Sequence, residues 1–412
     1  MAEIRPFACV RPCREKAAKI AALPYDVYNR KEAKEEVLRE PESFLKIDRA
    51  ETQFDDSVDI YAPEVYQKAH DMLWDMIAKG DFIRDKKSCY YIYELTMNGR
   101  TQTGITACAS IDDYENNVIK KHENTRAEKE LDRIRHVDIC DAQTGPIFLA
   151  YRDNAAITAI VNKIKTQDVE YDFTSPDGIR HRVWVIGEAG DIAAIRKAFA
   201  DIDQLYIADG HHRAASAVKV GEKRRNEHPG YTGEEEFNFF LSVLFPESEL
   251  KILDYNRVVK DLNGMTEDAF LQKIKEIFEV SELIAKDKHP QEKGTFSMYL
   301  KERWYTCKVR PEDQSEDPVK GLDVSLLQNL MLTPVLGITD PKTDPRIDFV
   351  GGIRGTKELE KRHEDAKAAF AMYPTSIGEL FAVADAGLLM PPKSTWFEPK
   401  LRSGLFIHLL NE

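Results

Sequence analysis

The alternation of apolar and polar side chains predicts a chain in which short strands are interspersed with helices. Two hairpins are the most local of these predictions. Segments 88–96 and 100–109 alternate along their length and flank Asn98-Gly99, which favours a two-residue hairpin turn. Segments 169–173 and 181–186 flank a Ser-Pro-Asp-Gly turn and predict a second hairpin.

Helices follow a different spacing, with apolar side chains three and four residues apart. Segment 61–79 shows it clearly, because Tyr66, Ala69, Leu73 and Met76 fall on one stripe. Further helices are predicted over 30–39, 155–165, 192–200, 267–278, 324–332 and 357–370. Single strands are predicted over 4–10, 43–49, 144–152 and 237–245. This mixture predicts an α+β (mixed α/β) fold.

The pattern also indicates a division of the chain into three parts. Residues 1–262 form the main α+β region, residues 263–338 change character and read as an inserted or appended subdomain, and residues 339–412 form a C-terminal segment. We expect this last segment to return and complete the active site. At 412 residues the chain is long enough for more than one hydrophobic core.

The segment 205–218, Leu-Tyr-Ile-Ala-Asp-Gly-His-His-Arg-Ala-Ala-Ser-Ala-Val, carries the densest candidate chemistry. Its apolar start predicts a strand and its small-residue end predicts a helix, so the polar residues between them lie at a strand-to-helix junction. A helix start offers free backbone N–H groups to an anion, Gly210 permits close approach, and Arg213 supplies a cation. We expect a phosphate to bind here.

Two simpler interpretations of this junction stay open. Asp209 is an ordinary helix cap in one of them, with His211 and His212 as solvated surface residues. The other is metal binding, which we consider unfavourable because adjacent histidines point in different directions on a helix and no second histidine follows four residues later. We therefore predict no metal-binding residues.

Composition narrows the range of partners. A net charge of −13 argues against a broad surface for nucleic acid or anionic membranes. The six cysteines are scattered without a Cys-x-x-Cys pair, which is typical of reduced thiols. Neither a signal peptide nor a membrane-spanning apolar run is recognisable, so we expect a cytoplasmic protein. A homo-oligomer is compatible with the sequence.

Three other segments are polar enough to suggest function. Tyr25 and Asp26 lie in a turn that could equally be a plain Asx turn, and the charged segment 119–136 could be a solvated helix. The segment 393–395, Lys-Ser-Thr, combines a cation with two hydroxyls in a proline-fixed loop, which suits an oxyanion or carboxylate. A stiffened surface loop is the alternative there.

In this order, the motifs resemble a bacterial and archaeal domain-of-unknown-function family related to the SerK/SbnI-type free serine kinases. The resemblance spans nearly the whole chain. The motifs that carry it are Ile4-Arg-Pro-Phe7, Leu23-Pro-Tyr-Asp-Val27, His122-Glu-Asn-Thr125 with Asp132-Arg133, Asp209-Gly-His-His-Arg213, Ile252–Val258 and Pro391-Pro-Lys-Ser-Thr395.

The resemblance implies a ParB/sulfiredoxin-like nucleotide-binding core and phosphoryl transfer from ATP or ADP, with Mg²⁺, to the hydroxyl of free L-serine or a similar metabolite. The predicted roles follow by motif. Nucleotide phosphates would be bound by Asp209, Gly210, His211, His212 and Arg213. The substrate would be bound by His122, Arg133, Lys393, Ser394 and Thr395.

The catalytic carboxylate is assigned to Asp26, with Glu123 second, because Pro24-Tyr25-Asp26 stands where the small kinases carry Pro-His-Glu. Asn256 stands where many members of the larger family carry histidine. Sulfiredoxin chemistry is disfavoured because the turn lacks cysteine, and a DNA clamp is disfavoured by the acidic charge. A non-catalytic nucleotide sensor is the alternative function.

Overall fold

The computed structural model describes residues 1–362 and 366–411, which divide into two compact units. Unit 1 comprises residues 1–250 and 399–412, and unit 2 comprises residues 251–398. The fold is α+β, as predicted. The sequence-based boundaries at 262 and 338 both lie inside unit 2, and the idea that 263–338 forms a separate subdomain stays a prediction.

Unit 1 is built on a mixed nine-stranded sheet in the order β6-β11-β8-β12-β5-β4-β10-β9, with β1 paired to β5. Its strands are β1 (Ile4–Arg5), β4 (Tyr90–Met97), β5 (Arg100–Ser110), β6 (Ile119–Lys120), β8 (Ile147–Tyr151), β9 (Tyr171–Thr174), β10 (Arg180–Ile186), β11 (Leu205–Asp209) and β12 (Phe239–Pro246). Two small ladders pair β2 (Val10–Pro12) with β3 (Phe82–Arg84) and β7 (Ala142–Gln143) with β21 (His408–Leu409). Both predicted hairpins, β4–β5 and β9–β10, are confirmed.

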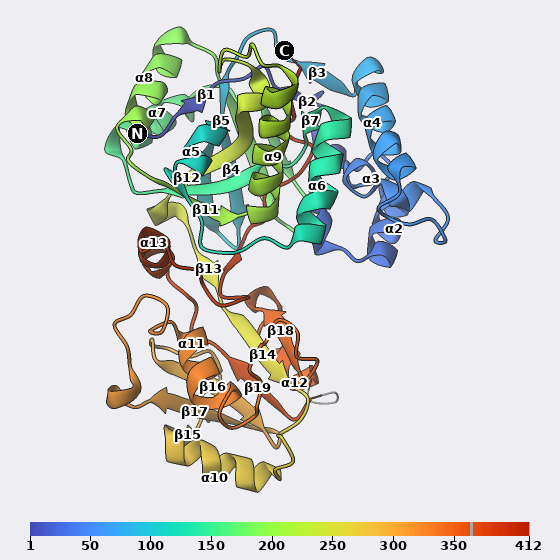
Figure 1. The fold of residues 1–412 in the computed structure, drawn as a ribbon. Helices are drawn as coiled ribbons and strands as arrows, with labels where there is room; N and C mark the ends of the chain where they lie inside the picture. Colours follow the sequence, from blue (N-terminus) through green and yellow to red (C-terminus); the bar gives the residue numbers. More distant parts are fainter. Residues whose placement is uncertain (363–365, 412) are drawn as a thin grey trace. The chain divides into compact units, whose positions relative to one another are not determined.

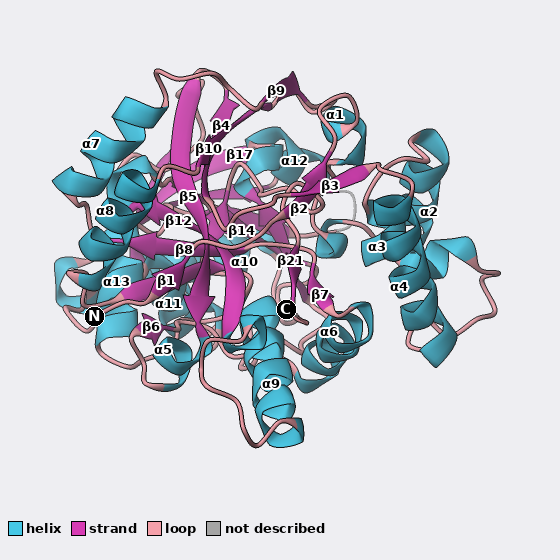
Figure 2. Ribbon diagram, turned by 90° about the horizontal axis from the view of Figure 1, so that it is seen from above, coloured by secondary structure: helices cyan, strands magenta, loops and turns pink. Residues whose placement is uncertain are grey.

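Helices gather on two sides of this sheet (Figures 1 and 2). They are α1 (Ala17–Ile20), α2 (Arg30–Arg39), α3 (Leu45–Asp48), α4 (Pro63–Ala78), α5 (Ile111–Glu115), α6 (Ala127–Cys140), α7 (Ala155–Ile164), α8 (Ala189–Ala200) and α9 (His211–Glu227). One core joins the sheet to α7, α8 and α9, and a second core lies among α2, α3 and α4. Helices α6 and α9 pack side by side (Figure 1).

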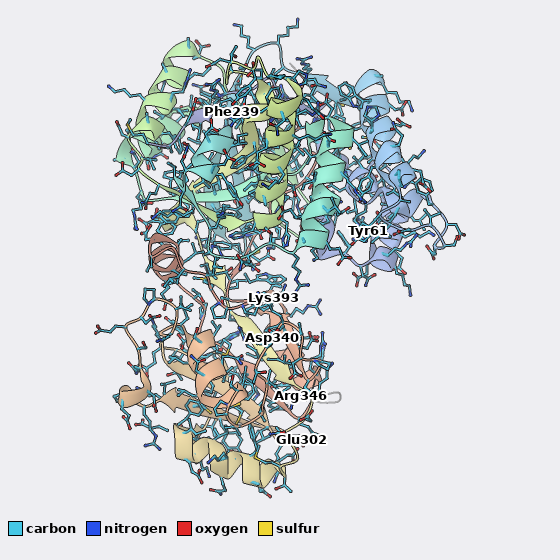
Figure 3. All side chains as sticks on the ribbon, in the orientation of Figure 1. Tyr61, Phe239, Glu302, Asp340, Arg346 and Lys393 are labelled. Carbon is cyan, nitrogen blue, oxygen red and sulfur yellow. The ribbon has the colours of Figure 1, made fainter. Side chains whose placement is uncertain are left out.

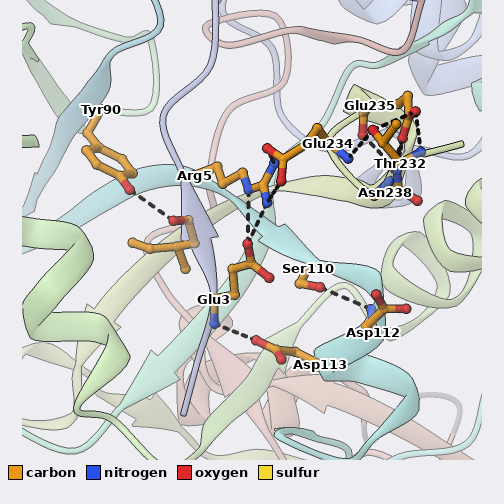
Figure 4. A network of polar contacts seen from close by, with 12 residues as sticks. Glu3, Arg5, Tyr90, Ser110, Asp112, Asp113, Thr232, Glu234, Glu235 and Asn238 are labelled. Atoms are coloured by element: carbon orange, nitrogen blue, oxygen red, sulfur yellow. Dashed lines mark hydrogen bonds and ion pairs between the residues drawn. The ribbon is translucent and has the colours of Figure 1, made fainter. Parts of the chain in front are cut away.

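The N-terminal strand β1 is fixed to unit 1 by a network of polar contacts (Figure 4). The Tyr90 hydroxyl donates to the Ile4 carbonyl over 3.0 Å, and Arg5 pairs with Glu234 at 2.6 Å. The backbone N–H of Glu3 donates to the Asp113 carboxylate over 2.6 Å. Burial raises the pKa of Asp113 to about 6, so this contact is made by a carboxyl that holds its proton unusually well.

Unit 2 is an antiparallel sheet in the order β15-β17-β16-β19-β14-β18, with a separate pair of β13 and β20. Its strands are β13 (Ile252–Leu253), β14 (Tyr255–Val259), β15 (Phe278–Glu282), β16 (Thr295–Leu300), β17 (Arg303–Val309), β18 (Ile347–Gly351), β19 (Ala368–Ala371) and β20 (Trp396–Phe397). Its helices are α10 (Glu267–Ile277), α11 (Asp323–Leu327), α12 (Thr356–Lys361) and α13 (Ile377–Asp385).

Two predicted elements are wrong. Segment 43–49, predicted as a strand, contains the short helix α3, because its apolar residues face a core from a helical turn. The helix predicted over 357–370 ends at Lys361 in α12, and its last part is the buried strand β19; residues 363–365 within it lie outside the described part of the chain. Across the described residues, no helix combines the length and apolarity that a membrane span requires.

Candidate active site at the start of helix α9

The predicted strand-to-helix junction is confirmed. Strand β11 ends at Asp209, Gly210 adopts a left-handed conformation with φ of 96°, and α9 begins at His211. A Cβ atom at position 210 would lie 3.1 to 3.3 Å from the guanidinium of Arg213. Glycine is therefore required both by the backbone and by the arginine that folds back over the turn.

Asp209 does not cap the helix, so the simple capping interpretation is wrong. The capping position is Gly210, and no side-chain hydrogen bond caps α9. The Asp209 carboxylate instead lies 3.4 Å from the Lys400 ammonium and 3.5 Å from the Arg213 guanidinium. Burial alone would raise its pKa, but these two cations lower the pKa of Asp209 to about 2, so the carboxylate stays charged.

The parallel pairing of β6 with β11 explains why a distant motif meets this turn. Leu205 pairs with Ile119 and Tyr206 with Lys120, so the residues that follow β6 lie beside those that follow β11. The His122 and His211 rings consequently meet edge to face, with centroids 4.5 Å apart. Burial lowers the pKa of His122 to about 4, which keeps the ring neutral at physiological pH.

A small pocket lies on the other side of α9, and both predicted arginines line it. Arg213 donates from Nη1 to the Pro146 carbonyl over 2.6 Å. The Arg133 guanidinium lies 4.1 Å from the centre of the Tyr25 ring, within cation–π distance. Burial raises the pKa of Tyr25 to about 12 despite both arginines, so its hydroxyl remains a hydrogen-bond donor.

Arg133 is held in place by carboxylates and aromatic rings. It donates from Nε to Asp132 over 2.9 Å, and the Tyr66 hydroxyl donates to the same carboxylate over 2.8 Å. Asp48, which is 4% exposed, lines the same pocket and accepts from the Thr144 hydroxyl over 2.9 Å. The pocket thus offers fixed donors, which need little reorganisation when an anion binds, beside one buried carboxylate that an anion would have to avoid.

Asp26 lines an adjoining pocket that shares Tyr25, Asp48 and Arg133 with the first. Its side chain is exposed, on the short helical turn Tyr25–Val27. Asp26 also contributes to the electrostatic surroundings of His212, which places the two motifs near each other. Asp26 therefore lies at a hollow of the surface that Arg133 also lines, and its role as the base stays a prediction.

His212 and Glu123 have surroundings that the motifs alone did not indicate. His212 accepts the backbone N–H of Arg126 on Nε2 over 3.0 Å and so satisfies the start of α6. Glu123 is exposed and lies with His122 and His211 rather than with Asp26. The two candidate carboxylates thus lie in different settings.

Lys393, Ser394 and Thr395 lie in unit 2, on the loop between α13 and β20, where Figure 3 labels Lys393. Ser394 is buried and donates to the Pro391 carbonyl over 2.7 Å, so its hydroxyl fixes the loop. The exposed Lys393 has φ of 59° and its ammonium lies 5.5 Å from the centre of the Tyr255 ring. Their role in binding substrate stays a prediction.

The family is decided by sequence over most of the chain. Residues 4–325 match the family model described as "Protein of unknown function (DUF1015)". The chain belongs to this family. The predicted membership of a domain-of-unknown-function family is thereby confirmed. No curated protein matches the chain.

Several solved structures resemble this chain, but only remotely. A free serine kinase in complex with AMP is 15% identical, with a TM-score of 0.35, over 73% of this chain and 92% of that one. SbnI with C-terminal truncation from Staphylococcus aureus is 12% identical, with a TM-score of 0.40, over 74% and 87%. A conserved hypothetical protein from Pyrococcus furiosus is 15% identical, with a TM-score of 0.34, over 74% and 95%. Likenesses of this size carry no conclusion for this chain, and the ParB/sulfiredoxin-like core stays a prediction.

Sequence reasoning on this family member missed Asp48, His136 and Lys400. None of the three stands in a motif that marks it as functional, although His136 ends the charged segment 119–136. Asp48 and His136 line the arginine pocket, and Lys400 reaches the Asp209 carboxylate from the C-terminal segment of unit 1. Lys400 could be found only from the fold, because the fold shows that residues 399–412 belong to unit 1.

Magnesium fits the ligand cluster at this site poorly. Mg²⁺ prefers oxygen ligands in octahedral geometry, whereas two of the three ligand atoms that His122, Glu123 and His211 bring together are imidazole nitrogens. A magnesium ion would therefore arrive with the nucleotide phosphates as part of the substrate. The prediction of Mg²⁺ with ATP or ADP stays a prediction.

Proposed function

We propose that unit 1 is a small-molecule kinase that transfers a phosphoryl group from ATP or ADP to a hydroxyl of free L-serine or a similar metabolite. The observation that carries the proposal is the meeting of Arg133, Arg213 and Tyr25 in one pocket beside the start of α9. The resemblance of the motifs to free serine kinases supports the same reaction.

The binding half of the proposal rests on charge. The uncapped start of α9 offers backbone N–H groups, and Arg213 and Arg133 add guanidiniums that match phosphate oxygens. Arg133 stays paired with Asp132. Arg213 and Lys400 share the single Asp209 carboxylate, so one net positive charge remains beside the helix start. Hydrogen-bond donors that are already held in place suit the phosphate chain of a nucleotide.

The chemical half rests on Asp26. In the proposed step the acceptor hydroxyl oxygen forms a bond to the terminal phosphorus, and the bond from that phosphorus to the bridging oxygen breaks. The hydroxyl proton passes to the Asp26 carboxylate, and the shortened nucleotide leaves with the electron pair. The arginines neutralise the charge on the phosphoryl oxygens during transfer.

A nucleotide sensor without catalysis is the second candidate. It is favoured by the exposure of Asp26, since a base that is open to solvent is less suited to proton transfer than an enclosed one. Binding and turnover must therefore be measured separately.

The test combines calorimetric titration of ADP and ATP with a search for phosphorylated product from a panel of hydroxylated amino acids and metabolites. Arg213→Ala should weaken nucleotide binding by about 10- to 100-fold, because charged hydrogen bonds are worth ~1.5–3 kcal/mol each. Arg14→Ala is the matched control, since the Arg14 side chain is 63% exposed. Binding without any product favours the sensor, and no nucleotide binding at all rejects both functions.

A further inference from the structure

We propose that His122, Glu123 and His211 bind a transition-metal ion of the zinc class at the start of α9. One nitrogen of each imidazole and one oxygen of the Glu123 carboxylate all lie within 4.8 Å of one another. This goes beyond the proposed function, because the ion would bind whether or not a nucleotide is present.

The topology of unit 1 brings these ligands together from two motifs. His122 and Glu123 follow β6, and His211 follows β11, its parallel neighbour. The carboxyl ends of parallel strands meet at one edge, so three ligands from distant positions converge without a long flexible loop. The His122 and His211 rings lie edge to face with centroids 4.5 Å apart, and one nitrogen of each lies within 4.8 Å of the other. A site built on element ends is already organised for a metal.

Three of the four ring nitrogens of the two buried histidines lack a hydrogen-bond partner among the described residues. His122 is 2% exposed and His211 is 6% exposed. Among the described residues, neither ring nitrogen of His122 has a hydrogen-bond partner, nor does Nε2 of His211. The Ile207 carbonyl lies toward His122 but outside hydrogen-bonding geometry. Buried imidazole nitrogens are normally paired, and a metal ion would satisfy both rings at once.

The donor set identifies the class of ion. Two imidazoles and a carboxylate form the ligand set of catalytic zinc sites, which keep a further position for water or substrate. Hard ions such as Mg²⁺ and Ca²⁺ prefer oxygen alone. Thiolates are absent from the cluster, so copper(I) and iron–sulfur chemistry do not suit it.

The metal cluster lies next to the proposed phosphate site. Asp209 and His211 are separated by Gly210 alone, and the ion would lie at the same helix start that the proposed nucleotide site uses. A zinc ion there can accept a phosphate oxygen in its open position. Zinc binding itself does not depend on that contact.

The experiment uses the full chain without a histidine tag, stripped with a chelator and titrated with Zn²⁺ in the absence of nucleotide. We expect one zinc per chain, retained in excess Mg²⁺, and a visible absorption band when Co²⁺ replaces zinc. His122→Gln and His211→Gln should each weaken zinc binding at least about 100-fold, since even outer partners of a metal site are worth 10- to 100-fold.

Two further variants keep the test decisive if a buried histidine variant fails to fold. Glu123→Gln changes an exposed residue, so folding is not at risk, and it should weaken zinc about 10-fold or more. His212→Gln and His228→Gln should leave zinc affinity unchanged. No bound zinc, or equal losses in the His211 and His212 variants, overturns the proposal. Because nucleotide is left out, such a failure is separate from failure of the kinase function.

Discussion

The two sides of the β11–α9 turn present opposite kinds of nitrogen. On one side the imidazoles of His122 and His211 offer lone pairs, which suit a cation. On the other side the guanidiniums of Arg133 and Arg213 can only donate, which suits an anion. The start of α9 thus has a cation-binding side and an anion-binding side, although His211 and Arg213 are only two residues apart in the sequence.

The two sides also differ in how completely they are paired. Arg133 is held by Asp132, and Arg213 donates to the Pro146 carbonyl. The nitrogens of His122 lack hydrogen-bond partners among the described residues. The paired guanidiniums are satisfied without a ligand. A buried imidazole nitrogen without a partner, by contrast, indicates that a binding partner is missing. The arginine side is therefore already organised by contacts within the protein, whereas the histidine side has buried nitrogens that a bound cation would satisfy.

The largest expected effect separates the two candidate bases, which lie on different sides. Asp26→Asn should reduce turnover by about 10²- to 10⁴-fold, the usual contribution of a general base, and leave nucleotide affinity unchanged. Product formation under saturating nucleotide measures it. Asp168→Asn, another exposed carboxylate of unit 1, is the matched control. If Glu123→Gln stops turnover and Asp26→Asn does not, the reaction belongs to the histidine side.

Local chemistry made part of this molecule predictable from sequence. The β4–β5 hairpin follows from Asn98-Gly99, whose φ angles of 51° and 78° are those that the dipeptide favours. The junction at Gly210 was also predictable locally, because glycine readily adopts the left-handed conformation found there. Segment 43–49 and strand β19 could not be assigned locally, because short apolar runs fit a strand or a buried helix equally well until tertiary packing decides.

The candidate site was predictable as a set of motifs but not as an arrangement. Asp26, Arg133 and Arg213 were all chosen from sequence, and their pockets adjoin. The pairing of His122 with His211 depends on the parallel ladder between β6 and β11, which joins residues some way apart in the chain. Sequence grouped His211 with His212 as phosphate-binding residues, whereas the fold packs the His211 ring against His122.

An intermediate effect tests the glycine between the two sides. Gly210→Ala should destabilise unit 1 by about 1–3 kcal/mol and weaken nucleotide binding, because a non-glycine residue at this φ is strained and its Cβ meets Arg213. Gly178→Ala is the matched control: its φ is 80°, yet a Cβ there has no atom within 4 Å. Thermal unfolding and nucleotide titration of both variants isolate the contact with Arg213. Equal nucleotide affinity in the two variants would show that the arginine does not need this glycine.

The smallest effect concerns His136, a histidine on the arginine side. Its Nε2 lies 3.2 Å from the Ile47 carbonyl, so this ring, unlike His122, has a partner. Burial and, next, the Arg133 guanidinium lower its pKa, and Asp48 and Asp132 oppose them only in part. The folded state therefore resists a proton that the unfolded chain accepts below about pH 6.5.

This linkage makes the stability from His136 fully present above about pH 6.5 and reduces it as the pH falls toward the lowered pKa of the folded protein. One proton is involved, so the loss is at most about 1.4 kcal/mol per pH unit. His136→Gln keeps a donor for the Ile47 carbonyl but does not titrate. Urea unfolding of both proteins at about pH 8 and about pH 5.5 should show a smaller loss for the variant, with the histidines elsewhere contributing equally to both. Parallel losses would mean that His136 is protonated in the folded protein, and the arginine side would then carry a third cation.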